Sequence, residues 1–187
     1  MLKAIGHFCL TKIWGWKIVG DFPRDIDKYI VLGGPHTSNW DFVLAVFAIW
    51  QAGLKMTIIG KQELFHPLIG WIFRALNVVP VDRKKNSNYV DAVVHEFGEH
   101  EEFRMLIAPE GTRKKVNRLK SGFYYIAKGA NIPIVTVGAN RPTKTLTIMP
   151  PLYPSGDKEA DFKIIYDFYN QQTGFVAENS FDSKALK

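Results

Sequence analysis

His36 and Asp41 lie five residues apart in the segment His36-Thr37-Ser38-Asn39-Trp40-Asp41, a spacing that can pair an imidazole with a carboxylate. If Ser38 or Asn39 caps a helix, Asp41 lies in its first turn and can reach back to one ring nitrogen of His36. The carboxylate then fixes the tautomer, and the other nitrogen acts as a general base. The pair predicts deprotonation of a hydroxyl that attacks an activated carbonyl. The alternative is that Asp41 only interacts with a helix dipole and His36 only closes a loop.

Two basic runs supply positive charge that could bind phosphate: Arg83-Lys84-Lys85 and Arg113-Lys114-Lys115. A planar guanidinium suits bidentate phosphate recognition, so Arg83 and Arg113, the members of each run that follow the predicted strand most closely, are the candidate phosphate ligands. Lys84, Lys85 and Lys115 are interpreted as solvated. Glu110 lies between a strand end and a glycine, and we expect it to pair with Arg113 or to hydrogen-bond a substrate.

Other kinds of catalytic or cofactor site are not supported by the sequence. No Gly-x-Ser-x-Gly motif is present, and Cys9 is the only cysteine, so we expect no protein nucleophile and no cysteine zinc site. His95 and His100 are one residue too far apart for the His-Glu-x-x-His zinc motif. Dinucleotide and P-loop motifs are also missing. These absences argue against a zinc site of either kind and against binding of a dinucleotide or a nucleoside triphosphate.

Composition favours one globular domain over residues 1–187 with anionic partners. The chain has 47% hydrophobic residues and a net charge of +6. Nucleic-acid binding would rest on charge alone, because no reading motif is present. No apolar run approaches the roughly 20 residues of a spanning helix, and the N-terminus does not resemble a signal peptide.

The N-terminal segment, residues 1–15, has the pattern of an amphipathic helix. On a helix, its apolar residues and the tryptophan that follows form one stripe: Leu2, Ile5, Cys9, Ile13 and Trp16. The stripe fits either a helix lying in a membrane interface or one packed on its own domain. A strand that begins near Trp16 is an alternative for the end of this segment, and it would shorten the helix. At the other end, residues 173–187 are predicted to form a polar, mobile tail.

Alternating strand and helix patterns predict an α/β fold with a mostly parallel central sheet flanked by helices. The predicted strands are 29–32, 56–59, 78–81, 104–107, 132–137 and 145–149. The predicted helices are 41–52, 67–76, 88–100, 122–128 and 157–171. Ligands of such sheets bind at the carboxyl ends of the strands. His36, Arg83 and Glu110 to Arg113 each follow a predicted strand, so we expect them to meet at one edge of the sheet.

Taken together, these segments resemble the 1-acylglycerol-3-phosphate acyltransferase (PlsC-like) family of glycerolipid acyltransferases. His36 and Asp41 match its His-x4-Asp block, and Pro109 to Arg113 match its Pro-Glu-Gly-Thr-Arg block in full. The stretch from Gly60 to Arg83 and the segment Ile132 to Val135 are similar to its remaining blocks. The order and spacing of the blocks cover roughly residues 30–140.

The resemblance implies transfer of a fatty acyl group from acyl-CoA or acyl-carrier protein to a hydroxyl of a lysophospholipid such as lysophosphatidate. His36 and Asp41 would form the base, and Arg83, Glu110, Gly111, Thr112 and Arg113 would bind the phosphate-bearing substrate. The acyl thioester is then a substrate and no cofactor is needed. We expect a peripheral protein on the cytoplasmic side of an anionic membrane surface, with a non-catalytic anionic-lipid-binding protein as the alternative.

Overall fold

The computed structural model describes residues 1–61, 65–68, 70–81 and 89–184. Its helices are α1 (Leu2–His7), α2 (Trp40–Ala52), α3 (Gly70–Ala75), α4 (Tyr89–Glu99), α5 (Gly122–Ala130) and α6 (Lys158–Tyr169), with a π-helix η1 (Phe8–Ile13) and a 3₁₀ turn η3 (Ala177–Asn179). Its strands are β1 (Lys17–Val19), β2 (Lys28–Gly34), β3 (Thr57–Lys61), β4 (Val78–Val81), β5 (Phe103–Ile107), β6 (Ile134–Asn140) and β7 (Thr145–Ile148).

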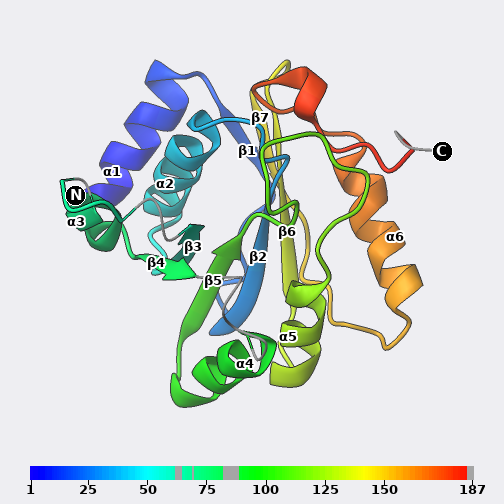
Figure 1. Ribbon diagram of the computed structural model, residues 1–187. Coiled ribbons are helices and arrows are strands. Elements are labelled where there is room, and N and C mark those ends of the chain that lie inside the picture. The colour runs from blue at the N-terminus through cyan, green and yellow to red at the C-terminus, as the bar shows by residue number, and fades with distance from the viewer. Residues whose placement is uncertain (62–64, 69, 82–88, 185–187) are drawn as a thin grey trace.

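Within the described residues, the strands form one sheet in the order β1-β7-β6-β2-β5-β3-β4. Every neighbouring pair is parallel except β6 and β7. β2 lies in the middle, with β6 on one side and β5 on the other, and is buried on both faces (Figure 1). The predicted α/β fold with a mostly parallel sheet is confirmed. β1 forms one edge of the sheet and begins at Lys17, where the alternative of a strand near Trp16 is confirmed.

Helices cover both faces of the sheet because successive residues of β2 point to opposite sides. Tyr29 and Val31 pack in one core with Leu10 of η1 and with α2, whereas Ile30 and Leu32 pack in another with α4, α5 and α6. In Figure 1 the first group of helices is seen on the left of the sheet, and α5 and α6 are seen on the right. Each face therefore has its own hydrophobic core.

Local signals in the sequence explain where several helices begin and end. Gly53 ends α2 in the left-handed conformation, with φ of 70°, and Asn131 ends α5 in the same way, with φ of 52°. The carboxylate of Asp157 begins α6 by accepting the backbone N–H groups of Glu159 and Ala160, each at 3.1 Å. These caps hold the helices in the register that positions the residues at the sheet edge.

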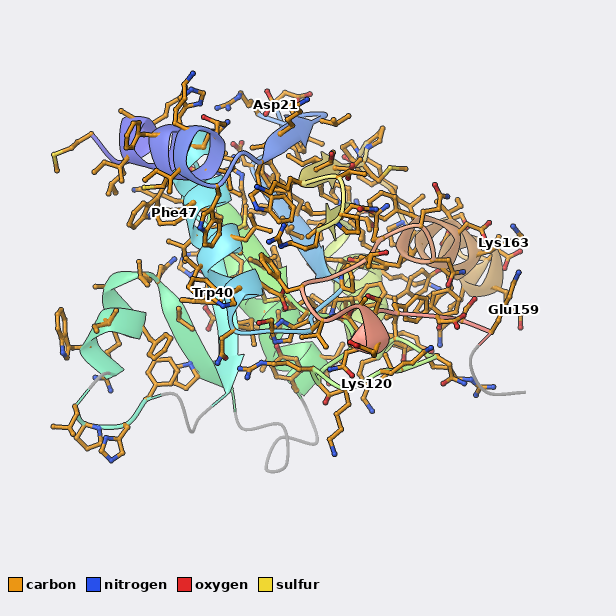
Figure 2. All side chains as sticks on the ribbon, turned by 90° about the horizontal axis from the view of Figure 1, so that it is seen from above. Asp21, Trp40, Phe47, Lys120, Glu159 and Lys163 are labelled. Carbon is orange, nitrogen blue, oxygen red and sulfur yellow. The ribbon has the colours of Figure 1, made fainter. Side chains whose placement is uncertain are left out.

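The N-terminal segment packs through a different face from the predicted stripe. Gly6 lies against α2 so closely that a Cβ there would meet the carbonyl oxygen of Phe47 at 2.7 Å, and Leu10 is fully buried. Leu2, Ile5 and Ile13 of the stripe stay exposed. The N-terminal helix therefore packs on its own domain against α2, the helix that carries Phe47 (Figure 2), while these three side chains of the stripe remain at the surface.

The predicted polar, mobile tail is wrong for residues 173–184. Phe181 is buried against Tyr166 and Tyr169, and the ring of Phe175 lies 5.7 Å from that of Trp16. Two aromatic residues in a mostly polar segment are enough to hold it on the domain, because each removes a large apolar surface from water. Residues 185–187 lie outside the described residues.

Candidate active site

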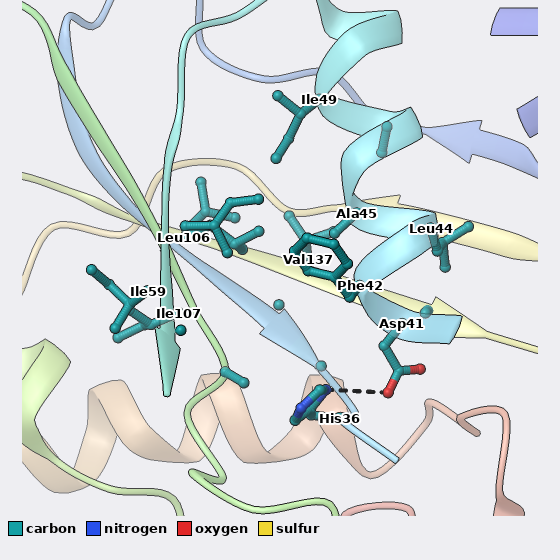
Figure 3. Close-up of a pocket in the computed structure, with 18 of the residues that line it drawn as sticks. His36, Asp41, Phe42, Leu44, Ala45, Ile49, Ile59, Leu106, Ile107 and Val137 are labelled. Atoms are coloured by element: carbon teal, nitrogen blue, oxygen red, sulfur yellow. Dashed lines mark ion pairs between the residues drawn. The ribbon is translucent and has the colours of Figure 1, made fainter. Parts of the chain in front are cut away.

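His36 and Asp41 meet at the carboxyl end of β2, as their spacing predicts. His36 follows the strand through Gly34 and Pro35, and Asp41 lies in the first turn of α2. His36 Nδ1 is 3.2 Å from Asp41 Oδ2, with the two side chains 26% and 13% exposed (Figure 3). A proton on Nδ1 is thus held by the carboxylate, and Nε2 is left with the lone pair of a general base.

Asp41 also organises the loop between the two residues. Its Oδ2 accepts the backbone N–H groups of Thr37 and Ser38, each at 2.6 Å. These bonds satisfy two amides of the loop that precedes α2, and they hold the carboxylate in one position. The alternative in which Asp41 only faces a helix dipole does not fit, because the same oxygen contacts the imidazole.

Glu110 lies behind His36 rather than beside Arg113. Its side chain is only 4% exposed, and Oε1 accepts the backbone N–H of His36 at 2.9 Å. Burial raises the pKa of Glu110 from 4.5 to about 7, an effect partly opposed by the His36 N–H. Within the described residues, Oε2 has no hydrogen-bond partner. Among the described residues Glu110 forms no ion pair with Arg113, and the contact that it does make is with the main chain of His36.

The remaining predicted phosphate ligands fall into two groups. Gly111, Thr112 and Arg113 line the same pocket as His36, and Gly111 makes the required turn with φ of 67°. Arg83 lies outside the described residues. The edge of the sheet therefore brings the first and third sequence blocks together.

A pocket of about 580 Å³ opens beside the His36–Asp41 pair, between α2 and the sheet. Its depth is lined mainly by apolar side chains, among them Phe42, Ala45, Ile49, Leu106 and Val137 (Figure 3). Its volume is within the 300–1,000 Å³ typical of ligand sites. The sequence indicated the polar end of this pocket but not its apolar interior. The apolar lining residues have the same sequence pattern as ordinary core residues.

A mostly parallel α/β sheet here sets a His–Asp pair and an arginine at the mouth of an apolar pocket, an arrangement whose chemistry suits activation of a hydroxyl beside an apolar ligand. The Acyltransferase family matches residues 21–140, and the chain belongs to this family. The resemblance carried by the sequence blocks is thereby confirmed. Among the described residues, no cluster of three or more metal-ligating side chains is present.

Relatives of known function are 1-acyl-sn-glycerol-3-phosphate acyltransferases. The protein from Cocos nucifera is 31% identical over 105 residues, which is 54% of this chain and 33% of the relative. The chloroplastic BAT2 protein of Brassica napus is 29% identical over 142 residues, which is 70% of this chain and 41% of the relative. The chain therefore spans less than half the length of either relative.

A solved structure shares the fold. It is the 1-acyl-sn-glycerophosphate (LPA) acyltransferase PlsC from Thermotoga maritima, with a TM-score of 0.59 and 19% sequence identity. The similarity covers 89% of this chain and 75% of that one. Identity at this level supports the fold and not the substrate.

Proposed function

We propose that this chain is an O-acyltransferase that transfers a fatty acyl group from a thioester to a hydroxyl of a lysophosphatidate-like acceptor. The observation that carries the proposal is the His36–Asp41 pair at the mouth of an apolar pocket. The names of the Cocos and Brassica relatives support the acceptor class. Acyl-CoA and acyl-carrier protein both fit as donors, since both present the same thioester.

In the proposed reaction, Nε2 of His36 removes the proton from the acceptor hydroxyl. The hydroxyl oxygen attacks the thioester carbonyl carbon, an ester bond forms, and the carbon–sulfur bond breaks. The proton then passes from the imidazolium to the leaving sulfur, which departs as a free thiol. Asp41 stabilises the imidazolium throughout, because its Oδ2 faces Nδ1 at 3.2 Å.

In this proposal the two ends of the pocket bind different parts of the substrates. The apolar depth suits the hydrocarbon chain of the acyl group, since burying each CH₂ contributes about 0.8 kcal/mol. We assign the phosphate of the acceptor to Arg113, since this guanidinium lines the polar end of the same pocket. The mouth of the pocket then brings the hydroxyl and the thioester to His36.

Exposed apolar residues on the same side of the molecule as α2 support the proposal that the protein acts at a membrane surface. Leu2, Phe8 and Ile13 are exposed on α1 and η1, and Leu68 and Trp71 are exposed before and within α3. Figure 1 shows α1 and α3 at the same edge of the molecule, beside α2. Such a surface suits a peripheral protein on an anionic bilayer, with the net charge of +6 adding attraction. In the described part of the chain, none of the helices has the length and hydropathy to cross a bilayer.

The test is thiol release from purified protein given acyl-CoA or acyl-carrier protein and lysophosphatidate, with monoacylglycerol as the phosphate-free acceptor. We expect release with lysophosphatidate and a loss of at least about 10²-fold in His36→Ala, the lower end for general-base catalysis. His95→Ala, which removes an exposed histidine on α4, should match the wild type. Absence of thiol release with either donor, together with binding to anionic vesicles, would instead support a non-catalytic lipid-binding protein.

A further inference from the structure

Thr37, the residue after the base, is buried although it is polar. Its side chain is 4% exposed, and its Oγ1 accepts the backbone N–H of Val176 at 3.2 Å. Gly174 lies directly on it, since a Cβ at that position would be 2.5 Å from Thr37 Oγ1 and 2.6 Å from Thr37 Cγ2. The main chain of residues 173–181, here called the strap, therefore closes over the loop that carries His36.

The strap is fixed to the domain independently of Thr37. At its start, the backbone N–H of Arg141 donates to the carbonyl of Thr173 at 2.7 Å. In its middle, the Phe175 ring packs on Trp16, and at its end Phe181 is 3% exposed. An element held at both ends and in the middle can act as a rigid support for a loop beneath it.

The loop from His36 to Ser38 is consequently held from three sides. Asp41 binds two of its amides, Glu110 binds the His36 amide, and the strap binds the Thr37 hydroxyl. The Thr37 contact holds a buried side chain directly after His36, from a segment far along the chain, and it restricts the direction in which the peptide after His36 lies. A shift of about 1 Å in a reacting group can cost about 10²-fold in rate, so this contact affects catalysis if it sets the position of His36.

We propose that the strap positions the catalytic base, with Thr37 as the positioning residue through which it acts. The inference rests on the proposed acyl transfer and adds a requirement to it: the His36–Asp41 pair needs residues 174–176 to reach its working geometry. Neither the strap nor Thr37 touches the substrate in this account.

Substitutions at Thr37 separate positioning from general stability. Thr37→Val keeps the shape but removes the acceptor, and we expect kcat for acyl transfer to fall about 10-fold or more with KM nearly unchanged. Thr37→Ser keeps the hydroxyl and should stay within about 2-fold of wild type. The matched control is Thr57→Val, which removes a similar acceptor for Asn77 at the other end of the sheet and should leave kcat unchanged.

Substitutions at glycine test the same contact from the strap side. Gly174→Ala forces the strap away from Thr37 and should lower kcat by a similar factor. Gly98→Ala is its control, because a Cβ at Gly98 meets nothing within 4 Å. Thr37→Val and Gly174→Ala break the same contact. The fold-decrease in kcat of the double variant should therefore be smaller than the product of the two single-variant decreases.

Amide hydrogen exchange at residues 36–38 of the unliganded protein gives a readout that does not depend on the substrate. We expect faster exchange in Thr37→Val and Gly174→Ala, and wild-type exchange in Thr37→Ser and Thr57→Val. Unchanged exchange in the first two variants overturns the proposal. Faster exchange in these two variants together with a wild-type kcat also overturns the proposal. If the wild type shows no acyl transfer at all, it is the proposed function that fails, and exchange alone then reports whether the strap holds the loop.

Discussion

Glu110 gives a stability prediction whose size follows from its burial. Its pKa is about 7 in the folded protein against 4.5 in the exposed state. Between these values the folded protein binds a proton that the unfolded chain has released, so its stability falls as pH rises. The contribution is complete below pH 4.5 and lost once pH passes about 7. The difference between these two pKa values corresponds to about 3 kcal/mol in the free energy of unfolding, at about 1.4 kcal/mol for each pKa unit.

Glu110→Gln is the variant that isolates this effect. The amide oxygen can still accept the His36 N–H, and the side chain cannot ionise. We expect the free energy of unfolding of the wild type to fall by about 3 kcal/mol more than that of the variant between pH 4.5 and pH 8. Other titrating groups are common to both proteins and cancel in this comparison.

The assay is urea denaturation of both proteins across this pH range, followed by circular dichroism. Glu101→Gln, a change at an exposed carboxylate, serves as the control and should follow the wild type. Parallel pH profiles for wild type and Glu110→Gln would refute the reasoning, because they would mean that burial does not hold a proton on Glu110.

Three further predictions concern turnover by the proposed acyltransferase. Asp41→Asn should lower kcat by about 10² or more, measured by thiol release, because the imidazolium loses its carboxylate; a wild-type kcat would contradict this. Arg113→Ala should raise KM for lysophosphatidate about 10-fold and leave KM for monoacylglycerol unchanged. Equal effects on both acceptors would show that Arg113 does not bind the phosphate. Ala48→Phe, about 10 Å along α2 from Asp41, should shift preference toward shorter acyl thioesters, seen by comparing kcat/KM across chain lengths.

Most of the fold could be predicted because each element has its own local signal. The six predicted strands and five predicted helices all appear, with ends that differ by a few residues. Strand β1 is the exception: three residues with an exposed, half-buried, exposed pattern carry little hydrophobic signal. Its place beside β7 is set by tertiary packing.

The candidate site could be predicted only where residue types are chemically distinctive. His36 and Asp41 were identifiable because their spacing and the glycines before them fit a strand-to-helix turn. The contact that Glu110 makes could not be predicted, because a buried carboxylate that accepts a main-chain N–H has the same sequence signature as one that binds a substrate. The strap was missed for a similar reason, since Gly174 and Val176 contribute backbone groups rather than functional side chains.

The N-terminal stripe shows that a hydrophobic pattern alone does not identify the face through which a helix packs. Leu2, Ile5 and Ile13 do line one face, as predicted, but the helix packs through Gly6 and Leu10 on another. Glycine adds nothing to a hydrophobic pattern, yet its missing side chain is what lets α1 approach the backbone of α2.

The hydrogen bond between Thr37 and Val176 joins residues 139 positions apart in the chain. Contacts of such long range form late in folding, because the intervening chain must first be ordered. During synthesis, His36 and Asp41 emerge long before the strap that closes over them. A ribosome-bound chain that stops before residue 174 would hence carry the whole His-x4-Asp sequence without the support above it, and the catalytic loop would reach its final order only after the strap had followed.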